Sequence, residues 1–324
     1  MTWKDLPLAV QIGLGAIVGI LLAASVAVAV LRRLRPDRDH TELASRVNSW
    51  WIMAGVFVAA ILLSRSASLV LFALISYLAL KEFFANTAWR RADRRPLFWA
   101  YLAIPLQYWW IADEWYGLFL VFVPVYCFLL IPMRMLVIGQ TDGYLRSAAT
   151  LQWGLMLTVF GLSHAAYLMV LRPAGDPEAW PGPGLLLFLV ALTQLNDVAQ
   201  YVWGKSLGRH KIVPKVSPGK TWEGFLGGVG TTTLLAILVG PWLTPMDVGQ
   251  SACAGAMLGV LGFFGDINLS AIKRDLGVKD SGSLIPGHGG ILDRVDSLTY
   301  TAPVFFHLVH WLFAWHHPSR FLGG

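Results

Sequence analysis

The chain contains few cysteines and few charged side chains. Only two of its 324 residues are cysteine, Cys127 and Cys253, and 14% are charged, whereas 56% are hydrophobic. Two cysteines inside apolar runs provide neither a disulfide framework nor the spacing of a thiolate metal site. A charged fraction this low is atypical of soluble domains. The composition therefore excludes an ordinary soluble protein, and nothing in it indicates a nucleic-acid partner.

Long apolar runs follow one another along the whole chain, with polar segments between them. A helix needs about 20 predominantly apolar residues to cross a hydrocarbon core of about 30 Å. We therefore predict an all-α, polytopic integral membrane protein with about nine or ten transmembrane helices. The first run is too long for the apolar part of a signal peptide, so we expect it to be retained. The expected spans are 7–31, 50–64, 66–84, 97–112, 115–133, 150–171, 184–203, 225–245, 252–267 and 298–315.

Lys and Arg are concentrated in alternate gaps between these spans. By the positive-inside rule these gaps face the cytoplasm and the N-terminus faces outward. From the chain length and the absence of a targeting segment we expect a bacterial inner membrane. Two of the gaps, 32–49 and 81–96, have charge without glycine turns, so we interpret them as solvated anchors. The gaps 204–224 and 268–297 contain glycine turns, and both lie in the second half of the chain. We therefore expect a membrane scaffold over 1–183 and a catalytic region over 184–324. The five gaps that hold 21 of the 25 basic residues are 32–49, 81–96, 134–149, 204–224 and 268–297.

The gap 204–224 ends in the segment SPGKTWEG, residues 217–224. This segment joins a tight turn to a lysine, a hydroxyl and a carboxylate where a helix is expected to begin. Backbone N–H groups at a helix start, with an ammonium nearby, form a natural phosphate site. The alternative is a plain helix cap by Thr221 or Ser217, and both roles are compatible. Asp197 lies upstream near the end of an apolar span, where a carboxylate usually has a cation or polar partner.

The gap 268–297 carries a denser polar cluster. Its segment PGHGG, residues 286–290, allows the backbone to turn sharply and approach a ligand closely. Asp293 and Asp296 are three residues apart, so both carboxylates share one face if this part is helical. Oxygen ligands at that spacing suit a Mg²⁺ ion that also binds substrate phosphates. We expect Arg294 to point away from the Asp pair, toward another phosphate or a structural acid.

Together these two gaps provide what phosphoryl or nucleotidyl transfer needs. The reaction requires cations around several phosphate oxygens and a divalent ion that bridges them. The candidate cations are Lys220, Lys273, Arg274, Lys279 and Arg294. The candidate metal ligands are Asp197, Asp266, Asp293 and Asp296.

The second gap resembles the signature of the phosphatidate cytidylyltransferases, also called CDP-diacylglycerol synthases. That signature has Ser, then Lys-Arg, Lys-Asp, a small residue, an apolar-Pro step, His-Gly-Gly and Asp-Arg-x-Asp. The segment 217–224, and Asp197 followed by Gly204-Lys205, are also similar to the family. The resemblance is specific over 196–297 and covers the rest only as a multi-span helical chain. The matching signature positions are Ser270, Lys273, Arg274, Lys279, Asp280, Gly282, Ile285, Pro286, His288, Gly289, Gly290, Asp293, Arg294 and Asp296.

The resemblance implies that CTP and phosphatidic acid react to give CDP-diacylglycerol and pyrophosphate, with Mg²⁺ as cofactor and K⁺ as a candidate second cation. It also implies a cytoplasmic active site and a homodimer. His288 is expected to donate to a phosphate oxygen or carry a proton, or else to serve only as a turn residue, and Glu223 to orient Lys220. The residues expected to act in catalysis are Asp266, Lys273, Arg274, His288, Asp293, Arg294 and Asp296. Those expected to contact the substrates are Ser217, Lys220, Thr221, Glu223, Lys279, Gly289 and Gly290.

Two other function classes stay open at this point. A CTP-dependent polyprenol kinase would share the nucleotide site, but its alcohol substrate would require a base. A non-enzymatic transporter or anion-binding protein would have repeat symmetry and polar residues deep in several spans. The sequence contains few such residues besides His164 and Gln194, and no clear inverted repeat.

Overall fold

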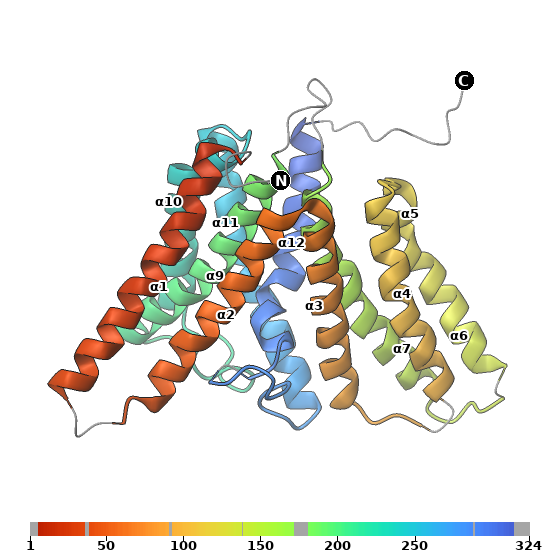
Figure 1. The fold of residues 1–324 in the computed structure, drawn as a ribbon. Coiled ribbons are helices and arrows are strands. Elements are labelled where there is room, and N and C mark those ends of the chain that lie inside the picture. Colours follow the sequence, from red (N-terminus) through yellow and green to blue (C-terminus); the bar gives the residue numbers. More distant parts are fainter. Residues whose placement is uncertain are drawn as a thin grey trace, which may run out of the picture.

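The computed structural model describes residues 6–35, 39–90, 93–137, 139–171, 181–287 and 289–313, and over these residues every regular element is a helix. This confirms the all-α fold class. The helices correspond to the ten expected runs, because α5, η3 and α6 form one continuous rod and α7, η4 and α8 form another (Figure 1). The elements are α1 (Leu8–Leu34), α2 (Thr41–Leu63), α3 (Arg65–Ala85), α4 (Arg94–Ala112), α5 (Tyr116–Val121), η3 (Phe122–Cys127), α6 (Phe128–Leu136), α7 (Tyr144–Leu155), η4 (Met156–Gly161), α8 (Leu162–Leu168), α9 (Gly182–Leu207), α10 (Trp222–Leu243), α11 (Val248–Asp275) and α12 (Leu292–Phe313).

Among the described residues, seven rods are long and apolar enough to cross a membrane. They are α1, α2, α3, the α5–α6 rod, α9, α10 and α11. The remaining rods, α4, α7–α8 and α12, have more polar residues, and α12 begins with an Asp-Arg pair inside its first turn. The protein is thus a polytopic membrane protein, while the total of nine or ten spans stays a prediction. The division at residue 183 also stays a prediction.

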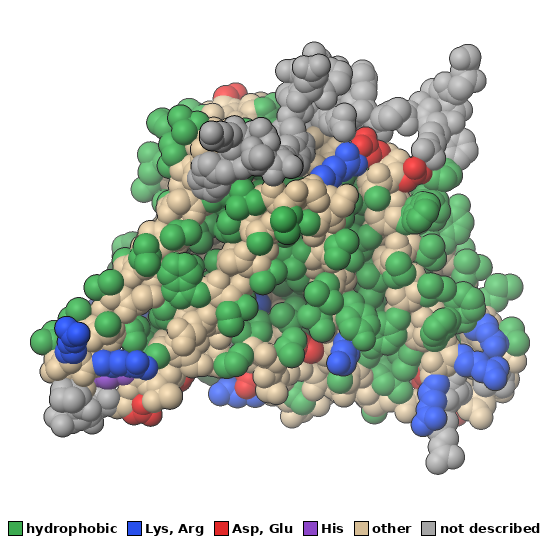
Figure 2. Space-filling model, in the orientation of Figure 1, with side chains coloured by type: hydrophobic (Ala, Val, Ile, Leu, Met, Phe, Trp, Pro, Cys, Tyr) green, Lys and Arg blue, Asp and Glu red, His purple; other side chains and the backbone are tan. Residues whose placement is uncertain are grey.

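The five basic gaps lie on one side of the molecule. In Figure 1 the helix ends that border these gaps, between α1 and α2, α3 and α4, α6 and α7, α9 and α10, and α11 and α12, lie along the same lower edge of the view. Lys and Arg side chains gather along that edge in Figure 2, below a surface that is largely hydrophobic. The arrangement agrees with the charge pattern of the sequence and sets one polar face for the site.

Helix α10 packs against α9 and α11 through a face of small side chains. Residues four apart lie on one face of a helix, and membrane helices approach most closely where those residues are small. The Thr232 hydroxyl donates to the Asn196 carboxamide of α9 over 3.1 Å, so a buried polar contact supports the packing. This close approach brings the polar ends of α9 and α11 together. The buried small residues of α10 are Gly224, Gly228, Thr232, Ala236 and Gly240.

Helices α1 and α2 lie at the periphery, tilted away from the other helices in Figure 1. Each buries few side chains, four in α1 and three in α2. Helix α2 begins at Thr41, nine residues before the expected span at 50, because a helix continues through the charged segment that precedes the apolar run. That extension carries the start of α2 to the polar face, where it reaches the site.

Candidate active site

Lys220 connects the first polar loop to helix α11. Its ammonium lies 2.5 Å from Asp266 Oδ2 and 3.0 Å from Gln200 Oε1 of α9. The next residue, Thr221, accepts a hydrogen bond from the Gly224 N–H and so caps α10. The cap fixes the chain direction directly after Lys220. The first polar gap of the sequence therefore meets α11 at Asp266, shortly before the second gap begins.

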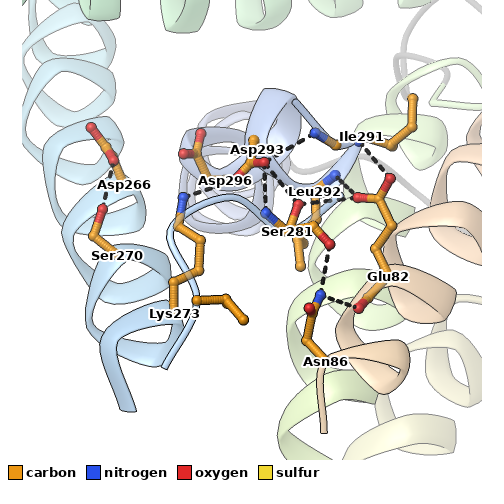
Figure 3. Close-up of polar contacts among 12 residues, drawn as sticks. Glu82, Asn86, Asp266, Ser270, Lys273, Ser281, Ile291, Leu292, Asp293 and Asp296 are labelled. Carbon is orange, nitrogen blue, oxygen red and sulfur yellow. Dashed lines mark hydrogen bonds and ion pairs between the residues drawn. The ribbon is translucent and has the colours of Figure 1, made fainter. Parts of the chain in front are cut away.

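Asp293, in the first turn of α12, is held by four donors. Its Oδ1 lies 2.7 Å from the Lys273 ammonium, and the pair is largely shielded from solvent, with side-chain exposures of 14% for Lys273 and 6% for Asp293. Its Oδ2 accepts from the Ser281 N–H and hydroxyl, each at 2.9 Å, and from the Gly290 N–H at 3.0 Å. Figure 3 shows these contacts between α11, the 276–291 loop and α12. A buried carboxylate is stable only when paired in this way.

The sharp turns of the 276–291 loop depend on glycine at two positions. Gly287 and Gly289 have φ angles of 73° and 81°, in the left-handed region that side chains with a Cβ rarely adopt. Ile285 and Gly289 form an isolated β-bridge across the turn. The turn folds the loop back so that its end enters α12 beside Asp293.

A small cavity of about 220 Å³ lies where α9, α11 and α12 meet. Five aspartates and two cations form its lining, so negative charge dominates. Lys220 adds a third cation through its pair with Asp266. The lining residues are Asp197, Asp266, Lys273, Asp280, Asp293, Arg294 and Asp296.

A larger cavity of about 900 Å³ adjoins the small one, since the two share residues of α9 and α12. Its volume is within the range of small-molecule sites. Arg294 lines both cavities, and its buried Nε has no hydrogen-bond partner among the described residues. Arg294 lines these cavities together with Asp293 and Asp296, while the direction of its side chain relative to the Asp pair stays a prediction. The lining includes Arg46 and Trp50 of α2, Gln194, Asp197 and Tyr201 of α9, Lys279, Asp280 and Gly289 of the loop, and Asp293, Arg294 and Asp296 of α12.

Close contact between α11 and α12 positions the remaining aspartates. A Cβ on Gly265 would lie 2.7 Å from the Asp296 carbonyl oxygen, so only glycine allows the two backbones to approach this closely. The Ser297 hydroxyl lies 3.1 Å from both Asp197 carboxylate oxygens and from the Gly262 carbonyl oxygen. Asp197 of α9 is thereby fixed against α12.

The donor atoms of the small cavity can be compared with the needs of a metal ion. Carboxylate oxygens are the hard ligands that Mg²⁺ prefers. Over the described part of the chain, no three carboxylate, imidazole or thiolate groups converge closely enough to hold a metal by themselves. Mg²⁺ usually takes one or two carboxylates and completes its shell with water and substrate phosphates. The residues therefore fit Mg²⁺ shared with a phosphate ligand.

Several residues expected at the site lie beside it. Glu223 accepts from the backbone N–H groups of Arg209 and His210 and pairs with the His210 ring, whereas Lys220 pairs with Asp266. The expectation that Glu223 orients Lys220 is therefore wrong. Arg274 is exposed, and its Nε donates to the Val216 carbonyl over 3.3 Å, which ties the two loops together.

The other expected residues occupy different surroundings. Ser217 forms part of the turn before Lys220, through a hydrogen bond from the Lys220 N–H to the Ser217 carbonyl. Gly290 is buried, and Ser270 donates to Asp266 over 3.3 Å. His288 lies outside the described residues.

Helices α2 and α3 contribute residues that the sequence did not indicate. The Ser49 hydroxyl donates to the Pro286 carbonyl over 2.7 Å, and Arg46 and Trp50 line the larger cavity. Glu82 and Asn86, at the end of α3, bond to the 281–292 segment. The interpretation of gaps 32–49 and 81–96 as solvated anchors is therefore wrong for these residues, because both helices extend to the polar face.

Comparison with known proteins gives matches over most of the chain. Residues 44–312 match the model of the cytidylyltransferase family. The uncharacterized protein YnbB of Escherichia coli is 46% identical over 292 residues, which cover 90% of this chain and 95% of YnbB. A phosphatidate cytidylyltransferase of Synechocystis is 43% identical over 41% of this chain, and one of Haemophilus influenzae is 41% identical over 40%. The matches span 48% and 46% of those two enzymes, about half of each.

Proposed function

The chain belongs to the cytidylyltransferase family and is a nucleotidyltransferase enzyme, and on this basis we propose that it is a phosphatidate cytidylyltransferase. It would transfer CMP from CTP to phosphatidic acid, with CDP-diacylglycerol and pyrophosphate as products. Relatives with that activity in their names match about two fifths of the chain. The observation that carries the proposal is the aspartate-lined cavity beside a larger one, with Lys273 and Arg294 in the lining.

The reaction would be an in-line displacement. A phosphate oxygen of phosphatidic acid forms a bond to the α-phosphorus of CTP, and the bond from that phosphorus to the β-phosphate bridging oxygen breaks, so pyrophosphate leaves. A phosphate monoester carries between one and two negative charges at pH 7 and is already a nucleophile, so no general base is needed. Lys220, Lys273 and Arg294 would offset charge on the phosphate oxygens.

We also propose Mg²⁺ as the cofactor. One or two of Asp197, Asp266 and Asp296 would hold it together with substrate phosphates, because Asp293 already has four donors around its two oxygens. When bound, the ion polarises phosphate oxygens and offsets charge on the leaving group. Asp293 would instead orient Lys273 toward the substrates. By the positive-inside rule the site would face the cytoplasm, where CTP is present.

An assay with two labelled forms of CTP tests the proposal. Purified protein would be mixed with phosphatidic acid, Mg²⁺ and CTP labelled at either the α- or the γ-phosphate. We expect the α-label to enter the lipid and the γ-label to leave as pyrophosphate. Asp296→Asn should lower turnover by about 100-fold or more, because it removes one of the carboxylates proposed to hold Mg²⁺ at the phosphates. Asp275→Asn is the matched control, since Asp275 is exposed at the end of α11 and lines neither cavity.

Each other outcome contradicts the proposal. Transfer of the γ-label to a polyprenol would identify a lipid kinase. Absence of both labels from lipid would exclude phosphatidic acid as substrate. Equal turnover by wild type and Asp296→Asn would place the chemistry elsewhere.

A further inference from the structure

Glu82 lies at the end of α3 and bonds to the start of α12, 209 residues further along the chain. Its Oε1 accepts from the Ile291 N–H at 2.9 Å, and its Oε2 accepts from the Leu292 N–H at 2.9 Å. Figure 3 shows the carboxylate directed from α3 into this turn. The first N–H groups of a helix have no partner within that helix, and a negative charge is favourable there. A distant helix therefore supplies a cap for α12.

Ser281 connects Glu82 to Asp293. The Ser281 hydroxyl lies 3.1 Å from Glu82 Oε2 and 2.9 Å from Asp293 Oδ2. On the other side, the Asn86 side chain donates to the Ser281 carbonyl over 2.6 Å. Glu82 in the last turn of α3 and Asn86 directly after that helix therefore hold the residue that contacts Asp293. A movement of Glu82 would release Ser281 and the start of α12 together.

Gly282 and Gly290 lie so close to the Glu82 carboxylate that neither position has space for a side chain. A Cβ on Gly282 would lie 2.9 Å from Glu82 Oε1, closer than real side chains approach. A Cβ on Gly290 would collide with Glu82 Oε2 and the Ser281 hydroxyl. The small residues on both sides of the turn thus fit around Glu82.

We propose that Glu82 is a positioning residue, which fixes the loop and the first turn of α12 and thereby holds Asp293 and Lys273 at the cavity. The inference rests on the proposed function for its catalytic consequence. The structural part of the inference does not depend on that function. Because Glu82 accepts hydrogen bonds from the N–H groups of Ile291 and Leu292, these groups should be protected from hydrogen exchange. Glu82 itself lines neither cavity, so it acts only through the residues that it holds.

The test compares Glu82→Gln with wild type, and with Asp275→Asn as a variant that removes an exposed charge from the same face. Glutamine keeps the size of the side chain but replaces one acceptor oxygen by a donor, which leaves at least one of the N–H groups without a partner. Hydrogen exchange of the 283–295 segment in purified protein should become about tenfold faster or more in Glu82→Gln. It should stay unchanged in Asp275→Asn.

Steady-state turnover, corrected for the folded fraction, measures the catalytic consequence. We expect Glu82→Gln to lower kcat by about tenfold or more, with a smaller change in the KM for CTP, because Asp293 and Lys273 are displaced. In a Ser281→Ala background the effect of Glu82→Gln should shrink, since both changes break one shared contact. A structural role alone would lower the folded fraction and leave the corrected kcat unchanged.

The outcomes separate the two proposals. Equal exchange of the 283–295 segment in wild type and Glu82→Gln would overturn the inference, whatever the activity. Faster exchange with an unchanged corrected kcat would also overturn it, because the contact would then have no catalytic consequence. A wild-type protein that is inactive on phosphatidic acid would overturn the proposed function, while the exchange result still decides whether Glu82 holds the turn.

Discussion

Thr221 illustrates how a single residue can satisfy the backbone beside a ligand site. Its hydroxyl caps α10 and is almost fully buried. We predict that Thr221→Ala lowers the thermal midpoint by a few degrees, because loss of such a cap costs about 1 kcal/mol. Thr221→Ser keeps the hydroxyl and should retain the wild-type midpoint. Differential scanning fluorimetry in detergent measures both midpoints, and an unchanged midpoint in Thr221→Ala would contradict the capping role.

Residues within one short motif were predictable, whereas distant partners were not. Asp293 and Asp296 have a spacing that brings both to one cavity, and the structure places them there. Glu82 is a single carboxylate at the end of an apolar run. No local sequence pattern distinguishes it from a carboxylate that is exposed to solvent at a helix end. Its partner lies 209 residues away, so only the folded chain reveals the contact. Arg46 was missed for the same reason.

At the scale of elements, the contact between α11 and α12 depends on Gly265. A Cβ there would meet the Asp296 carbonyl oxygen at 2.7 Å and the Ser297 Cα at 3.0 Å, both backbone atoms that cannot rotate away. We predict that Gly265→Ala separates the helices, lowers the thermal midpoint by several degrees and reduces turnover, since overpacking typically costs about 1–3 kcal/mol. Thermal unfolding and the labelled-CTP assay measure the two effects.

Gly230 provides the matched control for that prediction. It is exposed on α10, and a Cβ there would have no neighbour within 4 Å. Gly230→Ala should leave stability unchanged or raise it slightly, because alanine favours helix by about 1 kcal/mol over glycine. Equal stability of the two alanine variants would contradict the close approach of α11 and α12.

The positions of the helices could be predicted from the apolar runs of the sequence, but the residues at which the helices begin and end could not. The rods correspond to the ten expected runs, and among the described residues seven of them are long and apolar enough to cross a membrane. The start of α2 lies before its apolar run, since charged residues at a membrane surface can remain helical. It is this polar extension that brings Arg46 and Ser49 to the site.

At the scale of the whole molecule, the basic loops define an orientation that labelling can test. In a chain whose native cysteines are replaced by serine, Asp142→Cys adds a thiol to a basic loop and Pro245→Cys adds one to the opposite edge; both positions are exposed. A membrane-impermeant maleimide should label the first only in inside-out vesicles and the second only in right-side-out vesicles. The reverse pattern would put the site outside the cytoplasm.

The fold class and the common side of the basic loops were predictable because composition and charge are global properties. The packing of α9, α10 and α11 was not, since a stripe of small residues does not specify its partner. The cavities also depend on four separate helices, α2, α9, α11 and α12, and their shape follows only from how those helices pack.

Helix α12 is the last helix of the described chain, and it carries Asp293, Arg294 and Asp296. A ribosome releases the earlier helices first, so α9 and α11 reach the bilayer before their charged counterpart exists. The aspartate-lined cavity is therefore completed only after α12 has been synthesised. A polypeptide interrupted before residue 292 would contain α1 to α11 but lack three residues of the cavity lining, Asp293, Arg294 and Asp296.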